Sequence, residues 1–391
     1  MRFDVKMAAS TLPERQSRLG ARLSADRSVA GSTKSRFNCA AGPSLRLYSA
    51  PAVITLNGVS IISLGAMMDW QRRELLLAGV SGLALAGTAG EVAAAAPAAN
   101  PGDMLKGPYL DLTTPMGNML AVARMNGNLD LSKQKFGWYN GYVSGVRPGE
   151  ALRDLFGFAG FGVSRLLPHE SGTGYRKVLR EVGIYYDLKS GEPLEEYLNP
   201  YTNEKVRVVP VANDPFNVVI QDYFPPPPNY GGLNSSGPPP KIPLLLPWKK
   251  QGEYLTLERH IHLFYKNALQ PDKWPRESAG TMARVSEFFT YFFKGSEMQD
   301  SRATSLGFHG TWARVTPWLP WLLMGQAEGH CQYMTYQGSG QNLEDVLPRQ
   351  VLDYIEKKYP LYLNAPQKWV EPSLSSIERY SLEQTPAPPK K

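Results

Sequence analysis

Short runs of β-branched and aromatic residues alternate with groups of Gly, Asn, Asp and Pro through most of the chain. The clearest series lies at residues 180–223, where two turn signals, at residues 189–192 and 199–203, separate three such runs. This pattern is typical of an antiparallel β-meander. Its runs are residues 181–188, 193–198 and 206–211, and we expect further strands at residues 118–124, 135–146, 151–167, 253–265, 285–294, 306–316 and 328–336.

The apolar period changes once, near the C-terminus. Residues 342–359 carry Leu347, Val351 and Tyr354 at spacings of four and three, which predicts a helix with Pro348 near its first turn. Many strands and one late helix indicate a mainly β protein. We expect the meander to close into a lipocalin-like barrel, because closure removes exposed sheet edges. A two-sheet β-sandwich is the alternative.

Changes in composition suggest where the parts of the chain begin and end. Residues 100–369 are expected to form a single β-rich domain with a proline-rich loop at residues 224–247, because proline cannot donate to a β-ladder. This loop is interpreted as a plain excursion between strands, a lid over a barrel mouth or a docking segment for a partner. Residues 370–391 are expected to be a C-terminal tail that is disordered from residue 384 onward.

Residues 1–66 are a basic leader. They hold nine Lys or Arg and three Asp or Glu, so they carry +6 of the net charge of +7. The calculated pI of 9.1 therefore reflects the leader, and the remaining +1 does not indicate a nucleic-acid-binding protein. The leader is either absent from the native protein, with Met67 or Met68 as the initiator, or it is a transit peptide.

Residues 67–99 have the layout of a secretory signal peptide. Arg72 and Arg73 precede a weakly apolar segment at residues 75–89, and small residues follow it. The paired arginines resemble a twin-arginine export signal, although no Ser or Thr immediately precedes them. The apolar run is short against the ~20 residues of a membrane span. We therefore expect a periplasmic or secreted protein that engages the export machinery and keeps no stable span after cleavage.

Several kinds of chemistry have no motif in this sequence. We find no phosphate loop, dinucleotide fingerprint, Cys-pair zinc motif or Gly-x-Ser-x-Gly elbow, which argues against redox and phosphoryl-transfer enzymes. Cys39 lies in the leader, so the mature chain would hold only Cys331 and no internal disulfide. Cys331 is interpreted as a small buried hydrophobic residue.

A series of strand and turn motifs resembles the domain of unknown function 1838 family. The motifs, in order, are Trp138-Tyr-Asn-Gly141, Leu155-Phe-Gly-Phe158, a segment from Arg180-Glu181 to Gly191-Glu192 that contains Tyr186-Asp187, Asn199-Pro-Tyr-Thr202 and Asn213-Asp214-Pro215. The resemblance covers residues 118–369. It implies one continuous domain, and it carries over no catalytic residue to this chain.

The segment 254–264 holds the sharpest group of chemically active side chains. Alternate residues of a strand share a face, so Glu258, His260 and His262 lie together on one face. This face is interpreted as an outward polar surface, a polar barrel lumen suited to acid–base catalysis, or a site for a divalent metal held by His260 and His262. His330 would join such a site if its strand were adjacent.

Aromatic residues indicate a second feature, a ligand pocket. Trp312, Trp318 and Trp321 form a dense band, to which Trp138 and Tyr254 would add further walls. Such a band is either core packing or the wall of a pocket for an aromatic molecule.

Three functions are compatible with these observations. The first is an acid–base lyase, isomerase or hydratase that binds a small hydrophobic or aromatic molecule in the barrel and uses Glu258, His260 and His262. The second is a non-catalytic periplasmic ligand-binding protein. The third is a structural or interaction module that uses the proline-rich segment.

Overall fold

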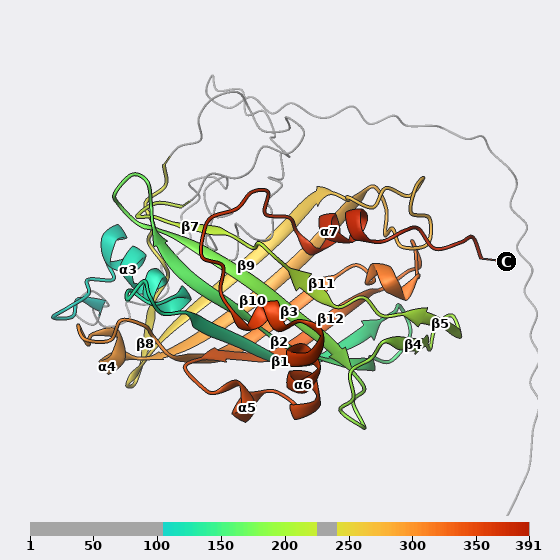
Figure 1. Ribbon diagram of the computed structural model, residues 1–391, viewed down its shortest axis with the longest axis horizontal. Helices are drawn as coiled ribbons and strands as arrows, with labels where there is room; N and C mark the ends of the chain where they lie inside the picture. Colours follow the sequence, from blue (N-terminus) through green and yellow to red (C-terminus); the bar gives the residue numbers. More distant parts are fainter. Residues whose placement is uncertain (1–104, 225–240, 391) are drawn as a thin grey trace, which may run out of the picture. The chain divides into compact units, whose positions relative to one another are not determined.

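One antiparallel sheet of ten strands dominates the computed structural model, which describes residues 105–224 and 241–390 (Figure 1). Its hydrogen-bonded order is β6-β3-β2-β1-β12-β11-β10-β9-β8, and β7 also pairs with β3. The strands are β1 (Lys135–Val146), β2 (Arg153–Pro168), β3 (Tyr175–Tyr186), β6 (Val211–Asn213), β7 (Val218–Ile220), β8 (Lys249–Gln251), β9 (Tyr254–Lys266), β10 (Met282–Lys294), β11 (Phe308–Thr316) and β12 (His330–Ser339).

The mainly β, antiparallel architecture predicted from the sequence is confirmed, but closure of the sheet is not shown. The pairing order ends at β6 and at β8, and among the described strands no pairing joins these two ends. The described residues all belong to one compact unit, Gly65–Lys391. The leader, the signal segment with Arg72 and Arg73, and residues 225–240 of the proline-rich loop lie outside the described residues.

Alternation along β9 and β10 gives this part of the sheet one buried inner face. In β10, Val285, Phe289 and Tyr291 are buried, whereas Phe288 and Phe292 between and beside them are exposed. A period of two is what a strand with one buried face requires. The inner faces of β1, β2, β3 and β9 to β12 therefore share one hydrophobic core.

The expected strand at residues 118–124 is wrong, because this segment is part of helix α3 (Pro115–Asn126). Thr114 caps the helix by accepting a hydrogen bond of 3.1 Å from the N–H of Gly117, and Pro115 occupies the first turn. The buried amide oxygen of Asn118 accepts from Leu246 N and Trp248 Nε1. The helix is thus joined to the segment that leads into β8.

The meander expected at residues 180–223 is interrupted. Its middle part leaves the main sheet and forms a separate hairpin of β4 (Glu196–Asn199) and β5 (Glu204–Arg207), after which β6 and β7 return to pair with β3. The strand expected at residues 206–211 is divided, since Pro210 lies between β5 and β6 and has no N–H to donate.

Short helices cover parts of the sheet. The single helix expected at residues 342–359 is two helices, α5 (Leu343–Val346) and α6 (Arg349–Lys358), with Pro348 as the N-cap of α6. Val351 and Ile355 of α6 pack on the outer face of β1 to β3, and Figure 1 shows both helices on that side. The remaining elements are α4 (Gly295–Met298), η2 (Pro320–Leu322), η3 (Pro360–Leu363) and α7 (Ser376–Glu383).

The C-terminal segment is structured, in contrast to the disordered tail that we expected from residue 384. Ser375 and Glu378 form a reciprocal capping box at the start of α7. Beyond the helix, Ala387 N donates to Glu277 and Arg276 donates to the carbonyl of Pro388. None of the helices in the described ranges is long and apolar enough to cross a membrane.

Candidate functional site

The histidine face of β9 points to solvent. Glu258, His260 and His262 are all exposed, because the alternate residues Leu257 and Ile261 are buried on the inner face. Glu258 pairs with Lys249 at 3.2 Å on the surface, and His262 Nδ1 lies 3.0 Å from Ser286 Oγ. Of the three interpretations of this face, the exposure of the side chains agrees with an outward polar surface and not with a polar lumen.

His330 does not join these histidines. It begins β12, which β11 and β10 separate from β9. Its side chain is half-buried and lines a surface hollow beside Trp318. Within the described ranges, no group of three His, Cys, Asp or Glu side chains is arranged to hold a metal ion.

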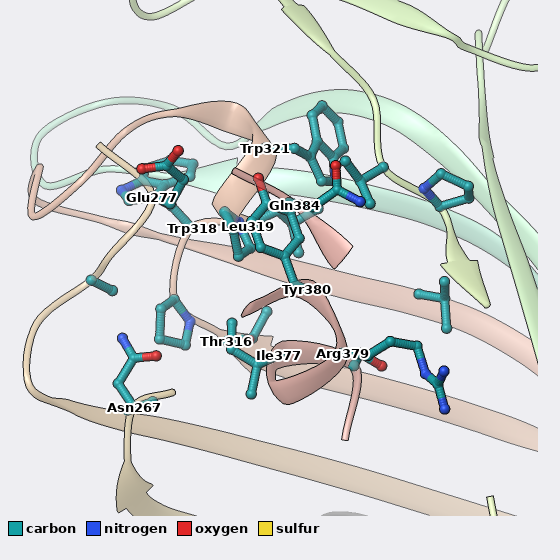
Figure 2. Close-up of a pocket in the computed structure, with 18 of the residues that line it drawn as sticks. Asn267, Glu277, Thr316, Trp318, Leu319, Trp321, Ile377, Arg379, Tyr380 and Gln384 are labelled. Atoms are coloured by element: carbon teal, nitrogen blue, oxygen red, sulfur yellow. The ribbon is translucent and has the colours of Figure 1, made fainter. Parts of the chain in front are cut away.

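The strongest candidate site is a cavity of about 130 Å³ that is partly open to solvent, near the ends of β3, β10, β11 and β12. The loop between β9 and β10, the loop between β11 and β12, and helix α7 complete its walls (Figure 2). Side chains that line it include Tyr185, Asn213, Asn267, Glu277, Arg314, Thr316, Trp318, Trp321, Tyr333, Ile377, Arg379, Tyr380 and Glu383.

The loop between β11 and β12 provides the aromatic wall. Trp318 is held by a hydrogen bond of 3.0 Å from its Nε1 to Ala327 O, and Trp321 packs against Tyr185 at 5.2 Å between ring centroids. Leu323 ends η2 with a left-handed backbone (φ 56°), which turns the chain sharply after the second tryptophan. Both tryptophans are buried, and both line the cavity.

The other residues predicted for the pocket lie elsewhere. Trp312 belongs to the inner core and lines a second cavity. Trp138 packs in the separate core beneath α6, where its Nε1 donates to Gln341 Oε1 at 2.7 Å, and part of it reaches that second cavity. Tyr254 is exposed and contributes to no described cavity.

A buried ion pair lies below the first cavity. Arg314 on β11 and Glu287 on β10 are directly opposite in the sheet, and Arg314 Nε is 3.5 Å from Glu287 Oε1.

The hydroxyls of Tyr185 and Tyr333 lie 2.9 Å apart, and burial raises the pKa of Tyr185 to about 12. Burial also raises the pKa of Tyr333 well above its usual value. Both phenols therefore stay neutral and serve as hydrogen-bonding groups at neutral pH.

Motif residues hold helix α7 over this cavity. Asn213 Nδ2 donates to Glu181 Oε2 at 2.7 Å and to Ser376 Oγ at 3.0 Å. Arg379 of α7 donates to the carbonyl of Asp214, whose carboxylate pairs with Arg180 at 2.8 Å. The polar residues around β3 thus fasten the C-terminal helix to the sheet.

The second cavity, of about 160 Å³, lies on the inner face of the sheet and is lined by residues of α3, β1 to β3 and β10 to β12. Lys177 and Glu181 line it, and Lys177 Nζ donates to Asn126 Oδ1 at 3.1 Å. Burial lowers the pKa of the Lys177 amine to about 8, an effect that the nearby Glu181 opposes. Gly137 lines this cavity and borders empty space, since the nearest atom to a Cβ placed there would be Gly338 O at 4.0 Å.

Sequence reasoning missed the charged groups of the interior. Arg259 and Glu287 occupy the apolar faces of β9 and β10, whereas Lys177 and Arg314 face the same interior. The sequence signal for such a residue is a charged side chain among apolar residues at alternate positions of a strand. Arg259, between Leu257 and Ile261, shows this pattern. Glu277 lies in a loop, where no periodicity marks a site.

The comparisons with known proteins bear on the motifs described above. The family model described as "Protein of unknown function (DUF1838)" matches residues 132–383, which is more than half of the chain. The matched region includes β1 to β12 and the helix that covers the first cavity. This match confirms the family resemblance of the strand and turn motifs. No curated protein matches the chain.

Proposed function

We propose that this protein, which belongs to the DUF1838 family, binds a small hydrophobic or aromatic molecule in the cavity beneath α7. The observation that carries the proposal is the wall of Trp318, Trp321 and Tyr380 around a space of about 130 Å³. An apolar cavity of about 150 Å³ is known to take up benzene, so this space suits about one aromatic ring. Aromatic walls favour such a ring through offset or edge-to-face packing.

The same proposal treats the curved sheet as an incomplete barrel with its ligand at one end. Helix α3 contacts β7 and meets the segment before β8 at Asn118 and Trp248. In this proposal these two elements cover the gap between the sheet edges. The proposal further holds that the protein acts in the periplasm or outside the cell, after export. The export assignment depends on residues 67–99.

A thermal-shift series tests ligand binding. Phenol, indole and cyclohexanol are added to the wild type and to Trp321→Ala, with Tyr336→Ala as the control because Tyr336 is 71% exposed. A ligand at one hundred times its Kd stabilises the folded state by about 2.7 kcal/mol. We expect the aromatic compounds to raise the Tm of the wild type and the control but not of Trp321→Ala. Equal shifts in all three proteins, or none, would contradict the proposal.

A second candidate, an acid–base lyase, isomerase or hydratase, is favoured by Lys177 in the second cavity. A general base works best when its pKa is near the working pH, and the pKa of this amine is about 8. Glu181 lines the same cavity and offers a second proton-transfer group.

The enzyme is distinguished from a binding protein by turnover. A panel of small aromatic lyase, isomerase and hydratase substrates is assayed with wild type, Lys177→Met and the double variant His260→Ala/His262→Ala. We expect activity that depends on Lys177 and not on the histidines. Loss of turnover only in the histidine variant would instead assign catalysis to the exposed face of β9 with His260 and His262. Ligand binding without turnover would favour the non-catalytic binding protein.

A further inference from the structure

The loop between β9 and β10 holds Glu277 in a defined position. Trp274 is almost fully buried and anchors the loop, and Ser278 N donates to its carbonyl at 2.9 Å. Gly325 N donates to the carbonyl of Arg276 at 2.7 Å, which joins this loop to the tryptophan loop. Glu277, which lines the cavity, therefore lies in a loop that a hydrogen bond joins to the neighbouring loop.

The carboxylate of Glu277 is only half satisfied. Glu277 is 4% exposed, and its Oε1 accepts a hydrogen bond of 2.5 Å from Ala387 N. Oε2 is buried and receives no hydrogen bond from any residue of the described ranges. Leaving a charged acceptor buried without a donor is costly, and such groups in native proteins commonly serve a site.

The arginines that line the same cavity already have acidic partners. Arg314 pairs with Glu287 at 3.5 Å, and Arg379 pairs with Glu383 at 3.2 Å. Arg276, next to Glu277 in the chain, pairs with Glu204 instead. Glu277 is therefore the carboxylate of this cavity that lacks a cationic partner among the described side chains.

Aromatic rings lie beside this carboxylate. Figure 2 shows Glu277, Trp318 and Tyr380 around the same hollow, and all three line the cavity. The charge of Glu277 helps to raise the pKa of Tyr380, although burial of the phenol is the larger cause. A cavity lined by a carboxylate and by aromatic rings suits a cation, because the π face of a ring also attracts positive charge.

We propose that the ligand of this cavity is a small aromatic amine whose protonated nitrogen pairs with the carboxylate of Glu277. Its ring lies against Trp318 and Tyr380, and the space of about 130 Å³ suits about one ring, so we expect the aminoalkyl arm to be short. This inference rests on the proposed function, because it names the class of ligand for the same cavity.

Three probes of similar size test the charge preference. Benzylamine, benzyl alcohol and benzoate are titrated by calorimetry into wild type, Glu277→Gln and Glu344→Gln at neutral pH. Glu344→Gln is the matched control, since it removes one carboxylate from an exposed site that is not part of the cavity wall. A charge-assisted, desolvated hydrogen bond predicts a Kd for benzylamine at least about tenfold lower than for benzyl alcohol in wild type and the control. In Glu277→Gln we expect the two Kd values to converge.

Each remaining outcome is decisive. If benzyl alcohol binds as tightly as benzylamine, or benzoate binds most tightly, the amine inference is overturned while the aromatic-ligand proposal stands. If none of the three probes binds, both fall. If Glu277→Gln fails to fold, Glu277→Asp replaces it, and we expect this variant to weaken the binding of benzylamine selectively.

Discussion

The side-chain amide of Asn199, at the end of β4, donates a hydrogen bond of 2.8 Å to the carbonyl of Leu322 in η2. Both residues are fully buried, and Asn199 Oδ1 also accepts from the N–H of Tyr201. Asn199 begins the Asn-Pro-Tyr-Thr motif that is typical of the family resemblance. The motif thus supports the loop that carries the cavity tryptophans.

Replacing Asn199 by Ala should weaken the protein and its cavity together. The carbonyl of Leu322 would lose its buried donor, which costs about 1–3 kcal/mol in the free energy of unfolding. We expect this loss in urea denaturation, along with weaker binding of aromatic probes. Asn342→Ala is the control, because Asn342 is exposed and its loss should change stability by less than about 0.5 kcal/mol. Equal stabilities of the two variants would show that the hydrogen bond from Asn199 to Leu322 does not stabilise this loop.

Removing one partner of the buried ion pair should be costly. Glu287→Ala leaves the guanidinium of Arg314 without its carboxylate, and breaking a buried pair costs about 3–5 kcal/mol in the free energy of unfolding. Adding Arg314→Met should recover part of this loss, which a double-mutant cycle by urea denaturation measures. Glu258→Ala, which breaks only the exposed pair with Lys249, should cost less than about 1 kcal/mol. Purely additive losses would show that the two groups do not interact.

Lys177 should make stability rise with pH in the alkaline range. Its pKa is about 8 in the folded protein, whereas an unfolded lysine keeps its ordinary value near 10.4. Between these two values the unfolded chain binds more protons, so the free energy of unfolding increases with pH by at most about 1.4 kcal/mol per unit. Below pH 8 both states are protonated and the contribution is constant.

The variant Lys177→Met isolates this effect. The difference in unfolding free energy between wild type and variant, measured by urea denaturation from pH 7 to 10.5, should shift in favour of the wild type. Lys205→Met, at an exposed lysine, should show no such trend. A flat difference for Lys177→Met would mean that the amine keeps its ordinary pKa.

Cys331 should be inert in the folded protein. Burial raises the pKa of its thiol to about 12, and the thiolate is the reactive form. At pH 8 we expect iodoacetamide to leave the Cys331 peptide unmodified in the native protein and to alkylate it completely in guanidinium chloride. Mass spectrometry of that peptide distinguishes the two states. Rapid native labelling would show that the thiol is accessible.

Local sequence patterns were sufficient for most of the strands. The strand at residues 285–294 and the turn at residues 189–192 depend on neighbouring residues alone, and both predictions are confirmed. Local signals also misled where a cap outweighed propensity, as at Thr114 and Pro115, which begin a helix instead of a strand.

The sequence alone determined the antiparallel, mainly β class, the family motifs and which side chains of a strand share a face, because these depend on spacing along the chain. It also showed that Glu258, His260 and His262 share one face. Only the tertiary structure decided that this face is the outer one, because burial depends on which neighbouring elements cover each side of the sheet. The cavity was likewise decided at that level, since Glu277, Trp318 and Tyr380 come from three distant segments that only packing brings together.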